Sequence, residues 1–397
     1  MSKRERNIST EQRLKELFRD YYLKAPLHLP PDFNLREFAF QLFGSSGYIR
    51  HKAFLSEAEL RNFVVQHVPK HMYFSAAKYL DPARPNMDEK MRIGTDLVFD
   101  IDADHIPKCE EVLQVLYLCP RCGAVIEKPR DTCEVCGSKL IEYQHIPEDC
   151  LEEAARITYL LTDVITNELG HKIFTITFSG HRGFHIHVQL NEEEGKMGSE
   201  ARRELLQYLL GEGTELEQYL VRVVKKRRRI YVKPPPRIVE GGWRRRIALF
   251  LLHKIQDYEI RTFIEGKKQA INTSKLTSIA DEINKLIQEA ITAMRIIVDE
   301  KVLIDLSRLI RVPESINGKA GFIVKRLTLD ELTNFKLDET LSPFASLELK
   351  ILPKVNMPKL RLLGKDIRLK RGVSLRIDGA LGVYLALKGL AEIIEVL

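Results

Sequence analysis

The alternation of apolar and polar positions along the chain predicts helices interspersed with short strands. Helical spacing of apolar residues covers residues 11–22, 56–68, 147–169 and 279–296. Short apolar or alternating runs predict strands over residues 96–102, 172–179 and 184–190. Residues 303–311 resemble a further helix that ends before Pro313. Helices and strands that follow one another in this way are typical of an α/β fold.

One predicted strand ends on paired carboxylates. Asp100 and Asp102 stand two residues apart, so they project from the same face, while Phe99 and Ile101 project from the other. Two adjacent carboxylates repel each other by ~1–4 kcal/mol, depending on the dielectric. Divalent cations with oxygen ligands would relieve that repulsion. A strand that simply ends in solvent, where aspartate is common, explains the pair equally well when it is taken alone.

A glycine-containing turn separates the next two predicted strands. Its sequence, from Ser179 to His185, is Ser-Gly-His-Arg-Gly-Phe-His. The two glycines permit a tight turn with exposed N–H groups, which is a suitable nest for phosphate. Arg182 on the turn and His185 on the following strand could contact the same anion, and arginine suits bidentate phosphate contact. A single histidine on a strand is usually structural, but the whole group favours an anion site.

Four cysteines occur in two CxxC pairs with ten residues between them. They are Cys119, Cys122, Cys133 and Cys136, and each pair is followed by glycine. Four thiolates at this spacing are typical of a closed, structural Zn²⁺ site, and a redox-active CxxC is the weaker alternative. Cys109 and Cys150 are then expected to be free thiols in a reducing compartment.

Composition excludes several classes of protein. The chain has 397 residues, of which 44% are hydrophobic and 29% charged, as expected of a globular protein with a substantial core. No apolar run approaches the roughly 18 residues of a membrane span. The charged first twenty residues do not resemble a secretory signal, so we expect a cytoplasmic protein without membrane contact.

The positive charge is concentrated in one window. Residues 222–246 hold 11 basic residues and one acid, a net +10, so a total of +7 leaves −3 for the rest of the chain. Such runs are most often solvated faces. Tyr231 and Trp243 are interleaved here, which favours a nucleic-acid template with bases stacked on the aromatic rings. An acidic partner subunit is the alternative. Arg227, Arg228 and Arg229 are the expected template contacts.

The carboxylate strand and the glycine turn together resemble the small catalytic subunit of archaeal and eukaryotic replicative DNA primases. Residues 36–40 and 48–50 resemble the N-terminal segment of that family, and residues 299–319 resemble its third motif. The resemblance runs in register from about Leu35 to Phe322. One departure is Asn317, which stands where many members of the family carry histidine.

The resemblance implies roles for particular residues. Asp100, Asp102 and Asp299 would hold two Mg²⁺ or Mn²⁺ ions, with Asp305 as a less well aligned competitor of Asp299. Ser179, Arg182 and His185 would hold the triphosphate of the incoming nucleotide, with Arg50 and Arg311 as further contacts. The four paired cysteines match the position of the family's zinc motif.

The resemblance also implies an activity and an architecture. The expected activity is primer synthesis on single-stranded DNA from nucleoside triphosphates, together with a large primase subunit. A repair or primer-extending polymerase, and an inert zinc-containing nucleic-acid-binding subunit, are the alternatives. The expected fold is an α/β core of mixed sheets over 1–104, 146–250 and 298–397, with a zinc subdomain over 105–145 and a helical insertion over 251–297.

Overall fold

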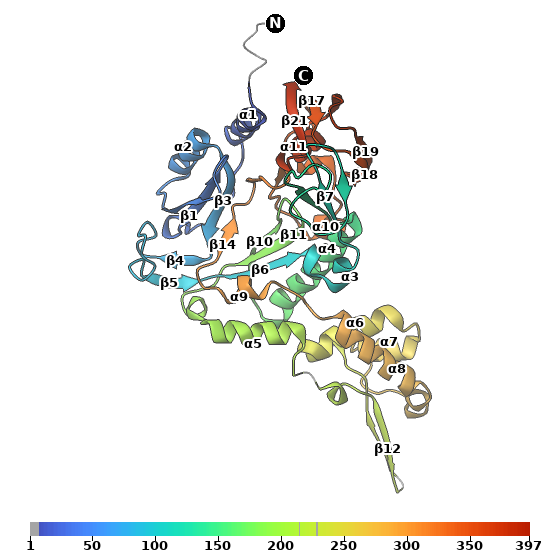
Figure 1. The fold of residues 1–397 in the computed structure, drawn as a ribbon. Helices are drawn as coiled ribbons and strands as arrows, with labels where there is room; N and C mark the ends of the chain where they lie inside the picture. The colour runs from blue at the N-terminus through green and yellow to red at the C-terminus, as the bar shows by residue number, and fades with distance from the viewer. Residues whose placement is uncertain (1–7, 214, 228) are drawn as a thin grey trace. The chain divides into compact units, whose positions relative to one another are not determined.

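The computed structural model describes residues 8–213, 215–227 and 229–397, and the chain divides into two compact units (Figure 1). The larger unit comprises Met1–Tyr159, Ile173–Ser199 and Val298–Leu397. The smaller unit comprises Leu160–Lys172 and Glu200–Ile297. It is wider than the helical insertion expected over 251–297, because it also takes in residues 160–172 and 200–250.

The N-terminal part of the larger unit is a four-stranded antiparallel sheet in the order β14-β3-β1-β2. Its strands are β1 (Phe38–Leu42), β2 (Tyr48–Lys52), β3 (Pro69–Ser75) and β14 (Leu309–Arg311). The helices α1 (Thr10–Tyr22) and α2 (Glu57–His67) accompany it, and both agree with the helical periodicity. Phe38 and Phe40 share one face of β1 and contact the buried ring of Phe54.

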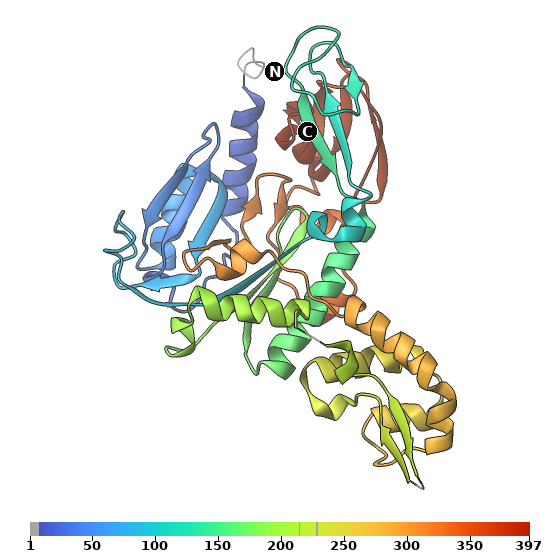
Figure 2. The same cartoon turned by 60° about the horizontal axis from the view of Figure 1, so that its bottom comes forward.

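A second sheet, in the order β10-β11-β6, lies in the same unit (Figures 1 and 2). Its strands are β6 (Leu97–Asp102), β10 (Ile173–Phe178) and β11 (Gly183–Val188), so all three predicted strands are confirmed. Pairing is antiparallel, with Asp100 opposite His185 and Asp102 opposite Gly183. The apolar side chains of Phe99 and Ile101 are buried, which leaves the two aspartates on the other face.

The remaining strands of the larger unit form small sheets that flank these two. They are β4 (Ala77–Tyr79) with β5 (Arg92–Thr95), β7 (Gln114–Leu118) with β8 (Val125–Ile126) and β9 (Ile141–His145), β15 (Ile316–Asn317) with β16 (Phe322–Ile323), β17 (Glu348–Pro353) with β20 (Leu375–Asp378) and β21 (Ala391–Val396), and β18 (Met357–Leu362) with β19 (Lys365–Leu369). The other helices of the larger unit are α3 (Pro107–Glu110), α9 (Glu300–Ile304), α10 (Leu329–Thr333) and α11 (Gly379–Leu387), together with the part of α4 (Glu148–Asp163) up to Tyr159. The mixed α/β architecture is therefore confirmed.

The prediction of a helix over residues 303–311 is wrong. The chain instead forms the short helix α9, whose last residue is Ile304, and then the strand β14. Ile310 is buried and stands opposite Phe74 of β3, so pairing with a distant strand overrides the local helical pattern. Asp305 accordingly follows a helix rather than lying within one.

The smaller unit is mostly helical. It contains most of α5 (Ser199–Leu210), followed by α6 (Gly242–Lys254), α7 (Tyr258–Ile264) and α8 (Thr273–Ala293), and the hairpin of β12 (Arg222–Lys226) and β13 (Arg229–Lys233). Ile247, Leu251, Ile260 and Ile287 are fully buried in its core. The predicted helix over 147–169 is observed as α4 (Glu148–Asp163), which continues as a π-helical turn, Val164–Glu168. Among the described residues, no helix is both long and apolar enough to cross a bilayer.

Cys109 and Cys150 form a disulfide, so the expectation of two free thiols is wrong. Both are buried, at the end of α3 and in the first turns of α4. Their separation of 41 residues encloses the four paired cysteines, which remain thiols. Sequence spacing could not reveal this pair, because the two cysteines meet only after the intervening segment folds back on itself.

Reduction of this disulfide is expected to lower stability. Chain-entropy arguments assign about 4 kcal/mol to a loop of this length, because the crosslink restricts the unfolded chain. Cys109→Ala together with Cys150→Ala should therefore lower the Tm of the larger unit. Thermal denaturation with and without reductant measures the effect, with the double variant as the reductant-insensitive control. A parent Tm that reductant does not change would contradict the crosslink.

Candidate active site

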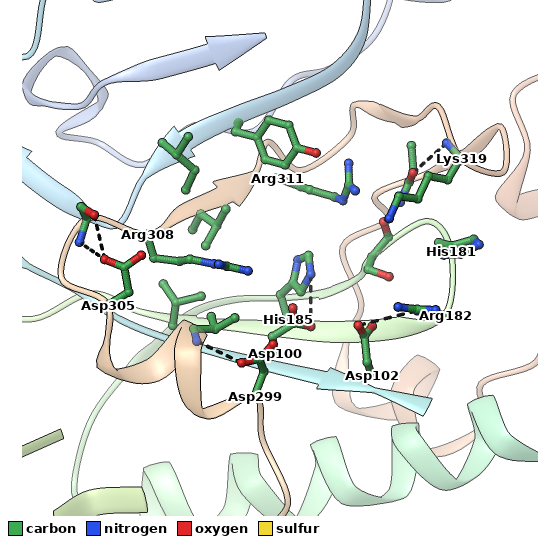
Figure 3. Close-up of a pocket in the computed structure, with 18 of the residues that line it drawn as sticks. Asp100, Asp102, His181, Arg182, His185, Asp299, Asp305, Arg308, Arg311 and Lys319 are labelled. Carbon is green, nitrogen blue, oxygen red and sulfur yellow. Dashed lines mark hydrogen bonds and ion pairs between the residues drawn. The ribbon is translucent and has the colours of Figure 1, made fainter. Parts of the chain in front are cut away.

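A cavity of about 520 Å³ in the larger unit gathers all of the nucleotide and catalytic-metal residues that the sequence predicts (Figure 3). We call it the main cavity. Its walls come from β2, β3, β6, β11, β14 and β15, from the turn that follows β10 and from the start of α9. The predicted residues that line it are Arg50, Asp100, Asp102, Ser179, Arg182, His185, Asp299 and Arg311. Residues up to 261 positions apart in the sequence are thus brought together, although their roles stay predictions.

The three carboxylates are held by backbone structure. The N–H of Asp299 donates to the carbonyl oxygen of Asp100 at 2.8 Å, which places the start of α9 beside β6. Asp299 is the N-cap of α9, and its Oδ1 accepts from the N–H of Val302 at 3.2 Å. Asp100 Oδ1 is buried and has no hydrogen bond from the described residues, since His185 Nε2 lies 3.5 Å away. A buried, unsatisfied carboxylate oxygen is what a cation-binding site requires.

The negative charges of the three carboxylates repel one another, which makes the carboxyl groups harder to ionise. Burial raises the pKa of Asp100 to about 6, and the nearby carboxylate of Asp299 adds to the effect. Burial and the charge of Asp100 likewise raise the pKa of Asp102 to about 6. Burial, with Arg311 nearby, lowers the pKa of His185 to about 4, so its imidazole is neutral at pH 7. Carboxylates that are costly to ionise together gain most from a divalent cation.

The stability of the metal-free protein should therefore fall as the pH rises through 6. The native pKa values of Asp100 and Asp102 lie above an unfolded value near 3.8, so the folded state binds protons more readily. Ionising each group lowers the free energy of unfolding by about 2–3 kcal/mol. This cost is small at pH 4, where the native carboxyl groups are protonated, and complete above pH 7. Asp102→Asn should raise the Tm at pH 7.5 in EDTA but not at pH 4. Parallel pH profiles for variant and parent would contradict this.

Cationic groups gather at one end of the main cavity. Figure 3 shows Arg182 and Lys319 at one end beside His181, whose lowered pKa leaves it neutral, with Arg308 and Asp305 at the opposite end and the three carboxylates between. Arg182 pairs with Asp104 at 2.8 Å and lies 3.7 Å from Asp102. The cavity thus offers a negative centre flanked by positive groups, which suits a metal-bound polyphosphate.

The turn at this end is fixed by close backbone approaches. Ser179 Oγ accepts from the N–H of Gly183 at 3.1 Å and closes the turn. A Cβ at Gly183 would lie 2.4 Å from the carbonyl oxygen of Ile101, so only glycine lets β11 approach β6 here. Gly180 has φ +74° and faces Asn317. These close contacts explain why glycine stands at both positions. They agree with the tight turn that the sequence predicts.

Asn317 has a structural role at the position where the family often carries histidine. Its side chain is buried, its Nδ2 donates to the carbonyl oxygen of Ser179 at 2.8 Å, and its Oδ1 accepts from the N–H of Lys319 at 3.0 Å. The amide therefore ties the glycine turn to the segment that carries Lys319. A neutral side chain fits this contact, because both of its polar atoms are used by backbone groups.

Arg50 and Arg311 are also held in place. Arg50 Nε donates to Glu37 Oε1 at 2.9 Å, and the buried Glu37 carboxylate also binds Lys90 at 2.8 Å. Arg311 bonds His71 Nδ1 at 2.8 Å and lies 5.0 Å from the ring of Tyr73. Orienting contacts of this kind reduce the entropy lost when an arginine binds an anion.

Several polar lining residues were not identified as site residues from the sequence. Among them are Arg308, Lys319, His181 and Tyr73. Lys319 and Arg308 lie in the segment that resembles the third family motif, but a lone basic residue carries no periodic signal. Asp305 also lines the cavity, and its Oδ1 is occupied by the N–H and hydroxyl groups of Ser307 at 2.8 and 2.7 Å. Asp299, unlike Asp305, is close enough to Asp100 for its charge to raise the pKa of that carboxyl group, which favours Asp299 as the third carboxylate.

The four paired cysteines converge on one point. The Sγ atoms of Cys119, Cys122, Cys133 and Cys136 all lie within 4.8 Å of one another, so the set, which we call the metal knuckle, could hold a metal ion. Gly123 and Gly137 adopt positive φ values of +78° and +67°, and their N–H groups close the two turns onto the carbonyl oxygens of Cys119 and Cys133. Such glycine turns explain why each CxxC pair is followed by glycine.

The basic window, residues 222–246, has fewer arginines free to bind a ligand than its net charge suggests. Arg244 pairs with Glu240, Arg245 with Asp163 and Arg246 with Glu168. Trp243 is only 5% exposed and its indole N–H donates to the carbonyl oxygen of Tyr208, so the expectation that it stacks on bases is wrong. Tyr231 and Arg227 are exposed on the β12–β13 hairpin. Arg228 and the side chain of Arg229 lie outside the described residues.

Comparison with known proteins identifies the family. The model of the DNA primase small subunit matches residues 138–329, and a model of a primase C-terminal domain matches residues 342–395. A Hyperthermus butylicus protein named DNA primase small subunit PriS is 35% identical over 98% of this chain and 98% of its own. Relatives of that name from Saccharolobus solfataricus and Sulfurisphaera tokodaii are 33% and 35% identical over 96% of this chain and 94% and 96% of their own. With matches that span nearly its whole length, this chain belongs to the DNA primase small-subunit family.

Proposed function

We propose that this chain catalyses template-directed nucleotidyl transfer, in which nucleoside triphosphates are joined into primers on single-stranded DNA. The observation that carries the proposal is the main cavity, where three carboxylates from two distant segments meet beside a cluster of cations. The 3′-hydroxyl of one nucleotide would attack the α-phosphorus of the next, forming a phosphodiester and releasing pyrophosphate.

Asp100, Asp102 and Asp299 fit a pair of divalent cations, Mg²⁺ or Mn²⁺. The buried Asp100 Oδ1 without a hydrogen bond, and the raised pKa values of Asp100 and Asp102, are both explained by a site built for positive charge. When bound, such ions activate the attacking hydroxyl and compensate the charge of the leaving pyrophosphate.

The protein's own groups bind and orient the nucleotide. Arg182 on the glycine turn and Arg311 on β14 supply charge to the triphosphate, and the turn, closed by the bond from the Gly183 N–H to Ser179 Oγ, holds Ser179 at the cavity wall. His185 is neutral at pH 7 and can still donate one hydrogen bond to a phosphate oxygen. Arg50 and Arg311 are pre-oriented by Glu37 and Tyr73, so positioning supplies a large part of the rate enhancement.

The other parts of the chain would serve the nucleic acid and the partner. The metal knuckle would hold a structural Zn²⁺, since four thiolates leave no open coordination position. Arg227, Arg228 and Arg229 of the basic window would track the phosphate backbone of the template. A large primase subunit, implied by the family name of the relatives, would complete the enzyme.

A priming assay on circular single-stranded DNA tests the proposal. The protein, alone and with its large subunit, is incubated with labelled nucleotides, either ribonucleotides or deoxyribonucleotides, and with Mg²⁺ or Mn²⁺. We expect short products that require template and metal but no supplied primer. Products that form only from a supplied primer would identify a primer-extending polymerase instead. Absence of incorporation under every condition would refute the assignment.

A further inference from the structure

A second pocket, of about 180 Å³, adjoins the main cavity in the larger unit. His181 and Arg182 line both hollows, so the glycine turn separates them. The other walls come from β9, which carries Tyr143 and His145, and from Tyr384 and Lys388 at the end of α11. None of these four residues has a role in the reaction proposed above.

The second pocket carries unbalanced positive charge. Lys388 Nζ lies 2.9 Å from His181 Nε2 and 5.4 Å from the centre of the Tyr384 ring. Burial and nearby cations hold the pKa of His181 well below its usual range, so the ammonium group donates and the imidazole accepts. Within the described part of the chain, no carboxylate lies within ion-pair distance of Lys388, Lys319 or Lys70. An acid, Glu142, lines the pocket and accepts from Gln144 at 2.8 Å.

Burial and the excess of positive charge in the second pocket lower the pKa of Lys388. Burial, and then the charges of Lys319 and Arg182, lower its pKa to about 8. An unpaired, largely buried ammonium group is costly, and an anion in the pocket would remove the cost.

The aromatic wall of the second pocket is rigid. The hydroxyl groups of Tyr143 and Tyr384 lie 3.2 Å apart and both side chains are buried. His145 stacks on Tyr143 with an interplanar angle of 18°. A pocket with a half-buried, unpaired cation beside a rigid wall offers charge to a phosphate group.

We infer that the second pocket binds a phosphate group of nucleic-acid chemistry other than the reacting triphosphate, with Lys388 as its cation. The inference rests on the proposed function, because primer synthesis from single nucleotides requires a second nucleotide beside the incoming one. The phosphate comes either from the triphosphate of that second nucleotide or from the backbone of a bound strand, and both present the same chemistry to Lys388.

Binding is tested with inorganic tripolyphosphate in excess Mg²⁺ by isothermal titration calorimetry. We expect two sites per chain in the parent and one in Lys388→Met, with an affinity loss of tenfold or more at the second pocket. Lys388→Arg should retain both sites because it keeps the charge. Lys354→Met is the matched control, since this lysine of the same C-terminal region is paired with Glu392 at 2.9 Å.

Two kinetic measurements identify the source of the phosphate. If it belongs to the second nucleotide, Lys388→Met raises the KM for the first dinucleotide about tenfold and leaves extension of a supplied 5′-hydroxyl primer unchanged. If it belongs to a strand, the variant binds single-stranded DNA more weakly, and the slope of log K against log salt falls by about 0.7.

The two proposals fail in different ways. If the main cavity does not bind triphosphate, the parent binds one tripolyphosphate and Lys388→Met none, which refutes the proposed function but supports the second pocket. If Lys388→Met folds like the parent, as judged by its Tm, and binds tripolyphosphate with the same stoichiometry and affinity, the second pocket is not a phosphate site.

Discussion

Replacement of Asp100 by asparagine is expected to lower primer synthesis by about three orders of magnitude while the protein stays folded. The substitution removes a negative charge from the centre of the main cavity, where Asp102 and Asp299 alone would have to hold the cations. It also removes the repulsion that raises the pKa of Asp102, so the Tm of the metal-free variant at pH 7.5 should rise rather than fall. Loss of activity with a gain in stability distinguishes a functional carboxylate from a structural one.

Asp305→Asn is the matched control for this experiment. Asp305 lines the same cavity and is an aspartate of the same segment as Asp299, but its Oδ1 is occupied by Ser307. We expect this variant to retain activity within a few-fold. Product formation at saturating Mn²⁺ and nucleotide measures both variants. Equal losses in the two, or substantial synthesis by Asp100→Asn, would contradict the carboxylate assignment.

Loss of the metal knuckle is expected to have the largest effect on stability. Structural Zn²⁺ sites in small peptides contribute about 10–16 kcal/mol, because the ligands are not preformed in the unfolded chain. The hydrophobic cluster around the knuckle contains few buried residues, among them Cys119, Cys133 and Leu140. Cys119→Ser with Cys136→Ser should therefore abolish metal binding and unfold the segment from β7 to β9 locally.

Metal analysis and limited proteolysis measure this outcome. The parent should contain one zinc per chain and resist cleavage between residues 119 and 137, whereas the double variant should contain none and be cut there. Val135→Ser is a suitable control, since Val135 lies in the same knuckle but is 75% exposed. Parent protein without zinc, or a protease-resistant double variant, would overturn the assignment.

The features that could be predicted from the sequence are those with a local physical signature. The two carboxylates and their buried neighbours alternate along a single strand, and the glycine turn is built from residues that tolerate close approach. The cysteine spacing is equally local. Each of these segments has the predicted local structure, and the main cavity unites the predicted residues from four separated segments.

The features that could not be predicted depend on contacts between distant segments. Residues 309–311 form a strand only because β3 is beside them, and Cys109 finds Cys150 only in the folded chain. From the sequence alone, the arginines at 244–246 are expected to be free to bind an anion. In the folded chain each pairs with an acid, Glu240, Asp163 or Glu168. Lys388 stands more than 200 residues from His181, and no spacing rule connects them.

The pairing of β14 with β3 also has a consequence for biosynthesis. These strands are separated by more than 230 residues, and the N–H of Asp299 bonds to Asp100 over a similar span. A ribosome must therefore release about three-quarters of the polypeptide before either contact can form. Until then one edge of β3 lacks its partner, and unpaired strand edges promote aggregation. The smaller unit, encoded between these partners, has time to fold first, and nascent chains arrested before residue 309 should be soluble only with chaperone help.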